Sequence, residues 1–134
     1  MKTIALIEKG NDGKYTVYTP DINHTIIGTG ETVAEAKTDF ENSVVEMITS
    51  YSEMNKPLPK ELDSISFEFR YDLASFFNHY PFINLSQFAK IAGINASLMR
   101  QYKVGQYISE KQMSKIESTL HMVGNELSSI KLIS

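Results

Sequence analysis

The spacing of hydrophobic residues in the first half of the chain predicts several strands and one helix. Residues 2–9 and 15–18 are rich in β-branched and aromatic side chains, and the glycine-bounded segment 10–13 between them is typical of a turn. Residues 24–28 predict a third strand. Residues 65–70, where apolar and polar side chains alternate, predict a fourth strand with one buried face. We therefore expect these segments to form one small, antiparallel-rich sheet.

A change to helical spacing follows residue 31. Thr32 with Glu35 forms a capping box, which predicts that a helix begins there. The prolines at 57 and 59 end the helical pattern. The apolar positions recur every three or four residues: Val33, Ala36, Phe40, Val44, Met47, Ile48 and Tyr51. Residues 1–70 are thus predicted to be an α+β domain with one long helix on a single face of the sheet.

The second half changes to short helices. Residues 71–80 predict a helix closed by a proline, and Asn84 with Gln87 predicts the start of another. Gly93 is placed to end that helix sharply, and Asn95 is placed to cap the next. The residues expected to face inward are Leu85, Phe88, Ile91, Ala92, Ile94, Leu98, Met99 and Tyr102. Two short helices joined by a tight turn are typical of a helix-turn-helix, although ordinary helical hairpins share this spacing.

A third helix supplies the core that such a pair needs. Ser109 with Gln112 predicts its start, and Gly124 is expected to break it before a short final helix. Its apolar residues are Met113, Ile116, Leu120, Val123, Leu127 and Ile130. Their steps of three and four fit packing within the domain, which we favour, and also fit a coiled-coil seam. Residues 71–134 are therefore predicted to be an all-α helix-turn-helix domain.

The face of the second short helix that remains outside this core is polar. A helix of this kind reads DNA by lying in the major groove, with some side chains on bases and others on phosphates. The predicted DNA-binding residues are Asn95, Ala96, Ser97 and Gln101 nearest the bases, Arg100 and Lys103 on phosphates, and Gln106 on the backbone beyond the helix.

The distribution of charge supports this division. The 134 residues carry a formal net charge of −3, but residues 1–70 hold 7 Lys/Arg and 12 Asp/Glu whereas residues 71–134 hold 6 and 4. The basic second half suits a phosphate backbone, and the acidic first half suits a cationic partner. Because an excess of two positive charges predicts weak binding by one domain, we expect a homodimer or a higher homo-oligomer.

Composition excludes several other functions. Without cysteine the chain has no disulfide, thiolate metal site or cysteine nucleophile. The apolar run near the first residue is too short for a signal or membrane segment, which predicts a cytoplasmic protein without a membrane partner.

Candidate catalytic groups are sparse. Glu8 is the only acid in a predicted strand before the helix, Asp12 and Asp21 lie in turns, and the acids of residues 31–46 are interpreted as solvating charges. The histidines, at 24, 79 and 121, lack metal-ligand spacing, so no metal, cofactor or catalytic residue is predicted. A magnesium nuclease that uses Glu8 with Asp12 or Asp21 remains the enzymatic alternative, and it requires these carboxylates to converge.

Two segments of the first half resemble a known family. An aromatic strand runs into Pro-Asp over residues 15–22, Tyr-Thr-Val-Tyr-Thr-Pro-Asp-Ile, and a helix start spans residues 28–36, Gly-Thr-Gly-Glu-Thr-Val-Ala-Glu-Ala. Together they resemble HicB-type antitoxins over residues 1–70, and the second half is similar to the helix-turn-helix tail of many members. The chain departs from the family where Asn23-His24 stands in place of Pro-Gly.

The resemblance implies a partial ribonuclease-H-like fold that lacks the catalytic acids. It also implies an antitoxin that binds and neutralises a small basic ribonuclease, a HicA-type toxin, and that represses its own operon by binding operator DNA. The alternative is a stand-alone helix-turn-helix regulator whose α+β domain senses a ligand or dimerises. A neighbouring reading frame for a short basic protein would favour the antitoxin.

Overall fold

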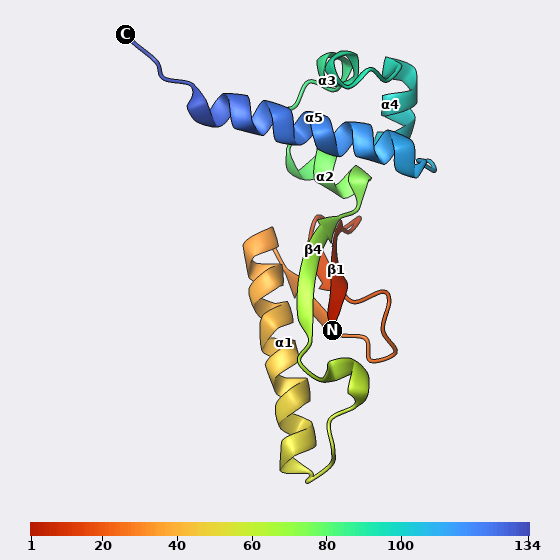
Figure 1. The fold of residues 1–134 in the computed structure, drawn as a ribbon, viewed down its shortest axis with the longest axis vertical. Helices are drawn as coiled ribbons and strands as arrows, with labels where there is room; N and C mark the ends of the chain where they lie inside the picture. Colours follow the sequence, from red (N-terminus) through yellow and green to blue (C-terminus); the bar gives the residue numbers. More distant parts are fainter. The chain divides into compact units, whose positions relative to one another are not determined.

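A computed structural model describes residues 1–134, which form two compact units, unit 1 (Met1–His79) and unit 2 (Tyr80–Ser134) (Figure 1). Unit 1 is built on a four-stranded mixed sheet in the order β3-β2-β1-β4. The strands are β1 (Lys2–Lys9), β2 (Tyr15–Tyr18), β3 (Ile27–Gly30) and β4 (Ser66–Tyr71). The β1–β2 and β2–β3 pairs are antiparallel, and the β1–β4 pair is parallel. The predicted α+β class is confirmed.

The long helix α1 (Val33–Glu53) covers one face of this sheet. Its predicted cap is present, because the Thr32 hydroxyl accepts a hydrogen bond from the Glu35 N–H at 3.1 Å. Phe40 lies at the centre of the core, fully buried, with the rings of Phe67 and Phe69 edge-on to it at 4.9 and 6.0 Å. The other buried apolar residues of this core are Ala5, Ile7, Tyr15, Val17, Ile26, Val33, Ala36 and Leu62.

The third strand begins later than its pattern predicts. Residues 24–28 were expected to form it, but β3 is Ile27–Gly30, with Tyr18 opposite Ile27 and Tyr15 opposite Gly30. The prediction was wrong because β propensity favours the Thr25-Ile26-Ile27 run, whereas the register with β2 and the approach of α1 favour two glycines in the strand. Residues 19–26 instead form a loop, in which the Thr19 hydroxyl accepts the N–H of Ile26.

Unit 1 also includes a short 3₁₀ helix, η1 (Lys60–Leu62), and the helix α2 (Leu73–His79). The division between the units falls after His79, whereas the sequence placed a boundary after residue 70. Hydrogen bonds hold α2 to the sheet: the Lys9 N–H donates to the Ser75 hydroxyl at 2.8 Å, and the Asp72 N–H donates to the Ile7 carbonyl at 3.1 Å. These bonds explain why α2 belongs with the strands.

Unit 2 consists of three helices, α3 (Leu85–Ala92), α4 (Ala96–Lys103) and α5 (Glu110–Ser129). The Ser109 cap of α5 is present, with the Gln112 N–H on the Ser109 hydroxyl. The predicted break at Gly124 is wrong, because α5 continues through that residue to Ser129. One glycine costs a helix only about 1 kcal/mol relative to alanine, and no proline follows to end it.

The apolar residues of α5 divide between two environments. Ile116 is buried, and Met113, Leu120 and Val123 are half-buried, so the first turns of α5 pack within unit 2 as favoured from the sequence. Leu127 and Ile130 are exposed. The apolar residues of α5 therefore do not all pack into the core of unit 2, although their spacing is regular. None of the helices combines the length and apolar character needed to cross a membrane.

Candidate nucleic-acid interface

Two side-chain caps set the positions of α3 and α4. The Asn84 Oδ1 accepts the Gln87 N–H at 3.1 Å, and the Asn95 Oδ1 accepts the Ser97 and Leu98 N–H groups at 2.8 and 3.3 Å. Between the helices, Gly93 has φ of 72°, a left-handed conformation that glycine adopts without steric cost. The chain therefore turns sharply from α3 into α4, as predicted from the sequence.

The core beneath these helices is small and closely packed. Phe88 and Ala89 of α3, Met99 and Tyr102 of α4 and Ile116 of α5 are all buried. Ala89 is fully buried, so a small side chain lies where α3 packs against the other helices of unit 2. Ile91 was predicted to face inward, but this prediction is wrong: its side chain is 56% exposed, whereas Phe88 and Ala89 of the same helix fill the core. The prediction is confirmed for Phe88, Ile94, Met99 and Tyr102, which are buried, whereas the other predicted residues, Leu85, Ala92 and Leu98, are half-buried.

Most of the predicted contact residues lie at the surface. Ser97, Arg100 and Gln101 are exposed on α4, and Asn95 and Gln106 are exposed just before and after it. Ala96 and Lys103 are half-buried. α4 thus presents one polar face that carries hydrogen-bond donors and acceptors together with a cation, the chemistry that base edges and phosphates require.

Local hydrogen bonds already occupy part of this face. The side-chain Oδ1 of Asn95 already accepts the Ser97 and Leu98 N–H groups in the helix cap. Its side-chain Nδ2 is therefore the group that can donate to an external acceptor. The Arg100 guanidinium donates to the Ser97 hydroxyl at 3.1 Å, which places the two side chains side by side. Gln101 has no recorded side-chain hydrogen bond. The Ser97 hydroxyl, which accepts from Arg100, keeps its hydrogen to donate, and Gln101 keeps its whole amide, so these two side chains are the best placed for base contacts.

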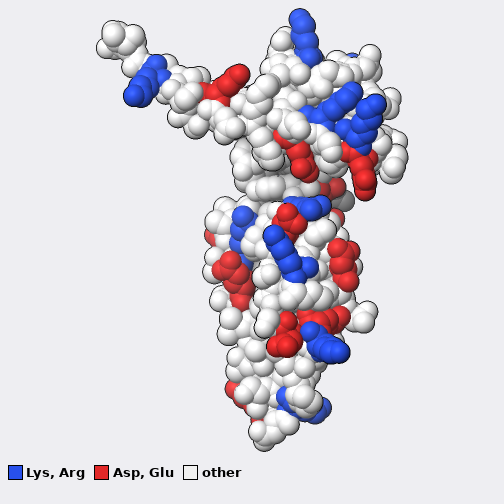
Figure 2. Space-filling model, viewed as in Figure 1, with Lys and Arg blue, Asp and Glu red and all other residues white.

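Further exposed cations of unit 2 lie on the two helices that flank α4 in the sequence. Lys90 is exposed in the last turn of α3 and Lys111 is exposed in the first turn of α5, and neither was among the predicted contact residues. Figure 2 shows Lys and Arg side chains gathered near the end of α4 and the start of α5. With Asp72 in unit 1, unit 2 holds 6 Lys/Arg against 3 Asp/Glu. Lys90 lies at a helix C-terminus, where the helix dipole favours a cation, whereas no comparable local signal marks Lys111 in the first turn of α5.

Unit 1 contains a hydrogen-bonded cluster around His24 that the spacing of residues in the sequence did not indicate. The His24 Nδ1 hydrogen bonds to the Glu61 carboxylate, and its Nε2 lies 3.2 Å from the Tyr51 hydroxyl. Glu61 also accepts the N–H groups of Asn23 and His24 at 3.2 and 2.9 Å. No role was predicted for His24, which lacks metal-ligand spacing, but this cluster joins the loop after β2 to η1 and α1. The partners lie far apart in sequence, so only the fold brings them together.

The Glu61 contacts predict a pH dependence of stability. The hydrogen bond with the His24 side chain, aided by the two backbone donors, lowers the pKa of Glu61 below its ordinary value of 4.5. A carboxyl whose pKa is lower in the folded state stabilises the fold above pH 4.5 and loses that contribution as the pH falls through the folded value. We expect Glu61→Gln to flatten the fall in the free energy of unfolding below pH 4.5, measured by urea denaturation.

The matched control for that experiment is Asp63→Asn, two residues away at an exposed position without a recorded side-chain hydrogen bond or ion pair. It should retain the wild-type pH profile. A Glu61→Gln profile that superimposes on that of the wild type would contradict the role assigned to this carboxylate.

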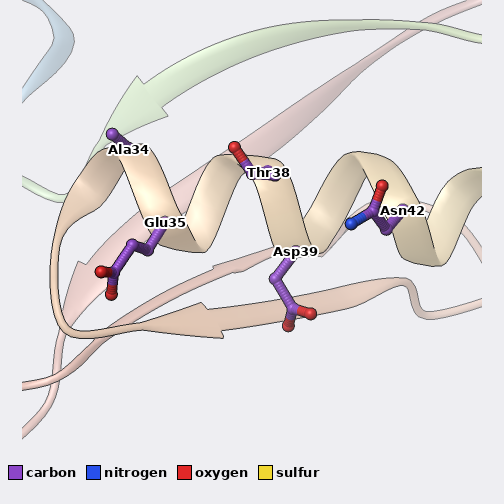
Figure 3. Close-up of a pocket in the computed structure, with 5 residues that line it drawn as sticks. All are labelled: Ala34, Glu35, Thr38, Asp39 and Asn42. Atoms are coloured by element: carbon purple, nitrogen blue, oxygen red, sulfur yellow. The ribbon is translucent and has the colours of Figure 1, made fainter.

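An acidic hollow lies on the outer face of α1 (Figure 3). Its lining residues are Ala34, Glu35, Thr38, Asp39 and Asn42. Glu35 and Asp39 point to the same side of the helix, where they accept the N–H groups of Glu31 and Thr29 at 2.9 and 2.8 Å. These acids therefore hold the connection from β3 to α1, beyond the solvating role expected for them.

Glu8, Asp12 and Asp21, the carboxylates that the nuclease alternative requires, do not share a hydrogen-bond partner. Glu8 accepts the Tyr18 hydroxyl at 3.1 Å, and Asp12 accepts the Lys14 N–H at 3.0 Å. Burial, followed by that hydrogen bond, raises the pKa of Tyr18. Asp21 lies exposed in the loop after β2. The chain contains no group of three or more His, Cys, Asp or Glu side chains placed to hold a metal ion.

The chain matches no protein-family model, no curated protein and no solved structure. The similarity to HicB-type antitoxins therefore stays a prediction that depends on the two quoted segments of the first half.

Proposed function

We propose that the protein is a DNA-binding antitoxin: unit 2 binds operator DNA and represses the operon, and unit 1 binds and neutralises a small basic ribonuclease of the HicA type. The observation that carries the DNA-binding part is the capped pair α3 and α4, which holds Ser97, Arg100 and Gln101 together on one exposed face. Such a face on a short helix after a tight turn suits the major groove. The proposal includes a homodimer, which doubles the phosphate contacts.

The antitoxin part of the proposal depends on charge and on the resemblance of residues 1–70. Unit 1 holds 7 Lys/Arg and 13 Asp/Glu, so its surface attracts a cationic partner and repels a phosphate backbone. The two units would then have different partners. A stand-alone regulator would use the same α4 face but would have no toxin.

The DNA-binding part is tested with the double variant Ser97→Ala/Gln101→Ala. We expect it to lose the preference for the DNA upstream of its own reading frame over a scrambled duplex, by at least about tenfold, because each base contact contributes roughly 1–3 kcal/mol of discrimination. Fluorescence anisotropy at fixed salt measures both affinities. The fold should survive, since both side chains are exposed.

Ser114→Ala/Ser118→Ala provides the matched control, since both serines are exposed and lie on α5 rather than on α4. It should retain the wild-type preference. An unchanged preference in the α4 double variant would contradict the assignment of this face.

The toxin part is tested by searching beside the reading frame of this chain for one that encodes a short basic protein and co-expressing the two. Formation of a complex that blocks RNA cleavage by that protein is the expected result. Operator binding without any such partner would favour the stand-alone regulator.

A further inference from the structure

The outer edge of β4 carries backbone groups that no other strand of unit 1 uses. β4 is the last strand of the sheet, with β1 as its neighbour. The Ser66 N–H donates to the Met1 carbonyl at 2.9 Å and the Asp72 N–H donates to the Ile7 carbonyl at 3.1 Å. Because successive residues of a strand alternate in direction, Phe67 and Phe69 direct their N–H and C=O groups away from β1, toward the open edge. This edge can accept a further strand.

The two faces of β4 differ in a way that suits such pairing. Phe67 and Phe69 are half-buried on the side of Phe40, so part of each ring remains to be covered at the edge. On the opposite face Glu68 and Arg70 are exposed, and their side chains form an ion pair of 3.1 Å. Figure 2 shows acidic and basic side chains interleaved over the part of unit 1 where Figure 1 places β4. A strand that pairs here meets alternating charge on one face and aromatic rings on the other.

We propose that this edge pairs antiparallel with β4 of a second copy of the chain, centred on Phe69. Phe69 then lies opposite Phe69 of the second copy, and the backbone N–H of each donates a hydrogen bond to the C=O of the other. Glu68 of each copy lies opposite Arg70 of the other, at a position without backbone hydrogen bonds, where side chains approach most closely. The two sheets become one continuous sheet across a two-fold axis.

Charge selects this register from its neighbours. The aromatic face stays on the core side only if residues of the same face lie opposite each other in the two copies. The two-fold axis must therefore pass through a residue of β4, and the alternative registers are those centred on the other residues of the strand. Centring on Glu68 places the two Glu68 carboxylates opposite each other, and centring on Arg70 places two guanidinium groups together. Centring on Phe67 pairs Glu68 with Ser66 and gains no ion pair. Centring on Tyr71 places Arg70 opposite Asp72, but Asp72 lies beyond the end of β4 and its carboxylate already accepts the Ser75 N–H and hydroxyl at 3.2 and 3.0 Å. Within β4, only the register centred on Phe69 places unlike charges opposite each other at two positions.

This inference deepens the homodimer of the proposed function by naming its surface, and it depends on that proposal only for the use of the dimer. The pairing itself requires neither DNA nor a toxin. Experiments on the free protein therefore test it separately: loss of operator binding would leave this edge pairing intact, and absence of edge pairing would leave the α4 face intact.

Cysteine cross-linking provides the first test, because the natural chain has no cysteine. Full-length Glu68→Cys and Arg70→Cys chains are mixed in equal amounts and oxidised. Opposite residues at such a position have Cα atoms roughly 4.5 Å apart, within the range of a disulfide. We expect the mixed dimer to be cross-linked at least about tenfold more than either variant alone. The second native Glu68–Arg70 pair remains in this mixed dimer and maintains the register.

Two results would overturn the proposal. Cross-linking of Glu68→Cys alone as efficiently as in the mixture would indicate a register centred on Glu68. Equal, background-level cross-linking in all three samples would show that the edges do not meet.

Charge reversal with amide exchange provides the second test. In the wild-type protein, exchange of the Phe69 amide hydrogen should slow at least about tenfold as protein concentration rises through the micromolar range, since pairing protects it. Glu68→Arg or Arg70→Glu alone should abolish this dependence, and mixing the two variants should restore it. Concentration-independent exchange in the wild type would contradict the pairing.

Discussion

Replacing Gly28 with alanine is expected to lower the free energy of unfolding of unit 1 by about 3 kcal/mol or more. A Cβ at Gly28 would lie 2.2 Å from the Phe40 nitrogen and 2.6 Å from the Ala36 carbonyl oxygen, both in the backbone of α1. Backbone atoms cannot rotate away as a flexible side chain can, so the whole helix must move off β3. Urea denaturation, with amide exchange of the β2 and β3 residues to report on unit 1, measures the loss.

The same substitution at Gly124 is the matched control, with the opposite expected sign. Gly124 lies inside α5, and a Cβ there meets nothing within 4 Å. Gly124→Ala should therefore stabilise the helix by roughly 0.5–1 kcal/mol. Tolerance of alanine at Gly28 to within 1 kcal/mol would mean that α1 does not approach β3 as closely as the structure shows.

Replacing Met99 with alanine is expected to have a comparable effect on unit 2. Met99 is fully buried among the three helices, and removal of a buried Met side chain costs about 2–5 kcal/mol because a cavity remains. A unit this short buries little core, so such a loss should unfold much of it at room temperature. Amide exchange within α3, α4 and α5 should accelerate, and the DNA binding proposed for α4 should be lost with the fold.

Ile91→Ala is the control for that experiment. Ile91 lies on the neighbouring helix but is mostly exposed, so its truncation should change stability by less than about 0.5 kcal/mol. Equal losses for Ile91 and Met99 would contradict the burial that the structure assigns to these two side chains.

Local signals in the sequence predicted the elements that depend on local chemistry. Thr32, Asn84, Asn95 and Ser109 cap helices where their side chains were expected to do so. The turn at Gly93 and the first two strands were predicted for the same reason, since each depends on a few adjacent residues. The polar face of α4 followed from the spacing of its apolar residues, because Met99 and Tyr102 turn inward and leave Ser97, Arg100 and Gln101 outside.

Features that depend on distant residues were missed or misplaced. β3 follows from its register with β2 and from the closeness of α1 to Gly28, neither of which is visible in strand propensity. The contact between His24 and Glu61 requires the loop after β2 and η1 to meet, and nothing in either segment indicates this. Lys90 and Lys111 come from helices on either side of α4, and their relation to it appears only once the turns are known.

The parallel pairing of β1 with β4 has a consequence for the growing polypeptide. β1, β2 and β3 are consecutive, so they can associate as soon as they leave the ribosome. β1 nevertheless has one side without a neighbour until residues 66–71 have been synthesised and carried back past α1. Closing such a long loop is slow compared with forming a local turn. During translation, the edge of β1 that β4 later covers is therefore exposed. Pauses that delay the synthesis of β4 would prolong the interval in which the nascent protein is prone to aggregate.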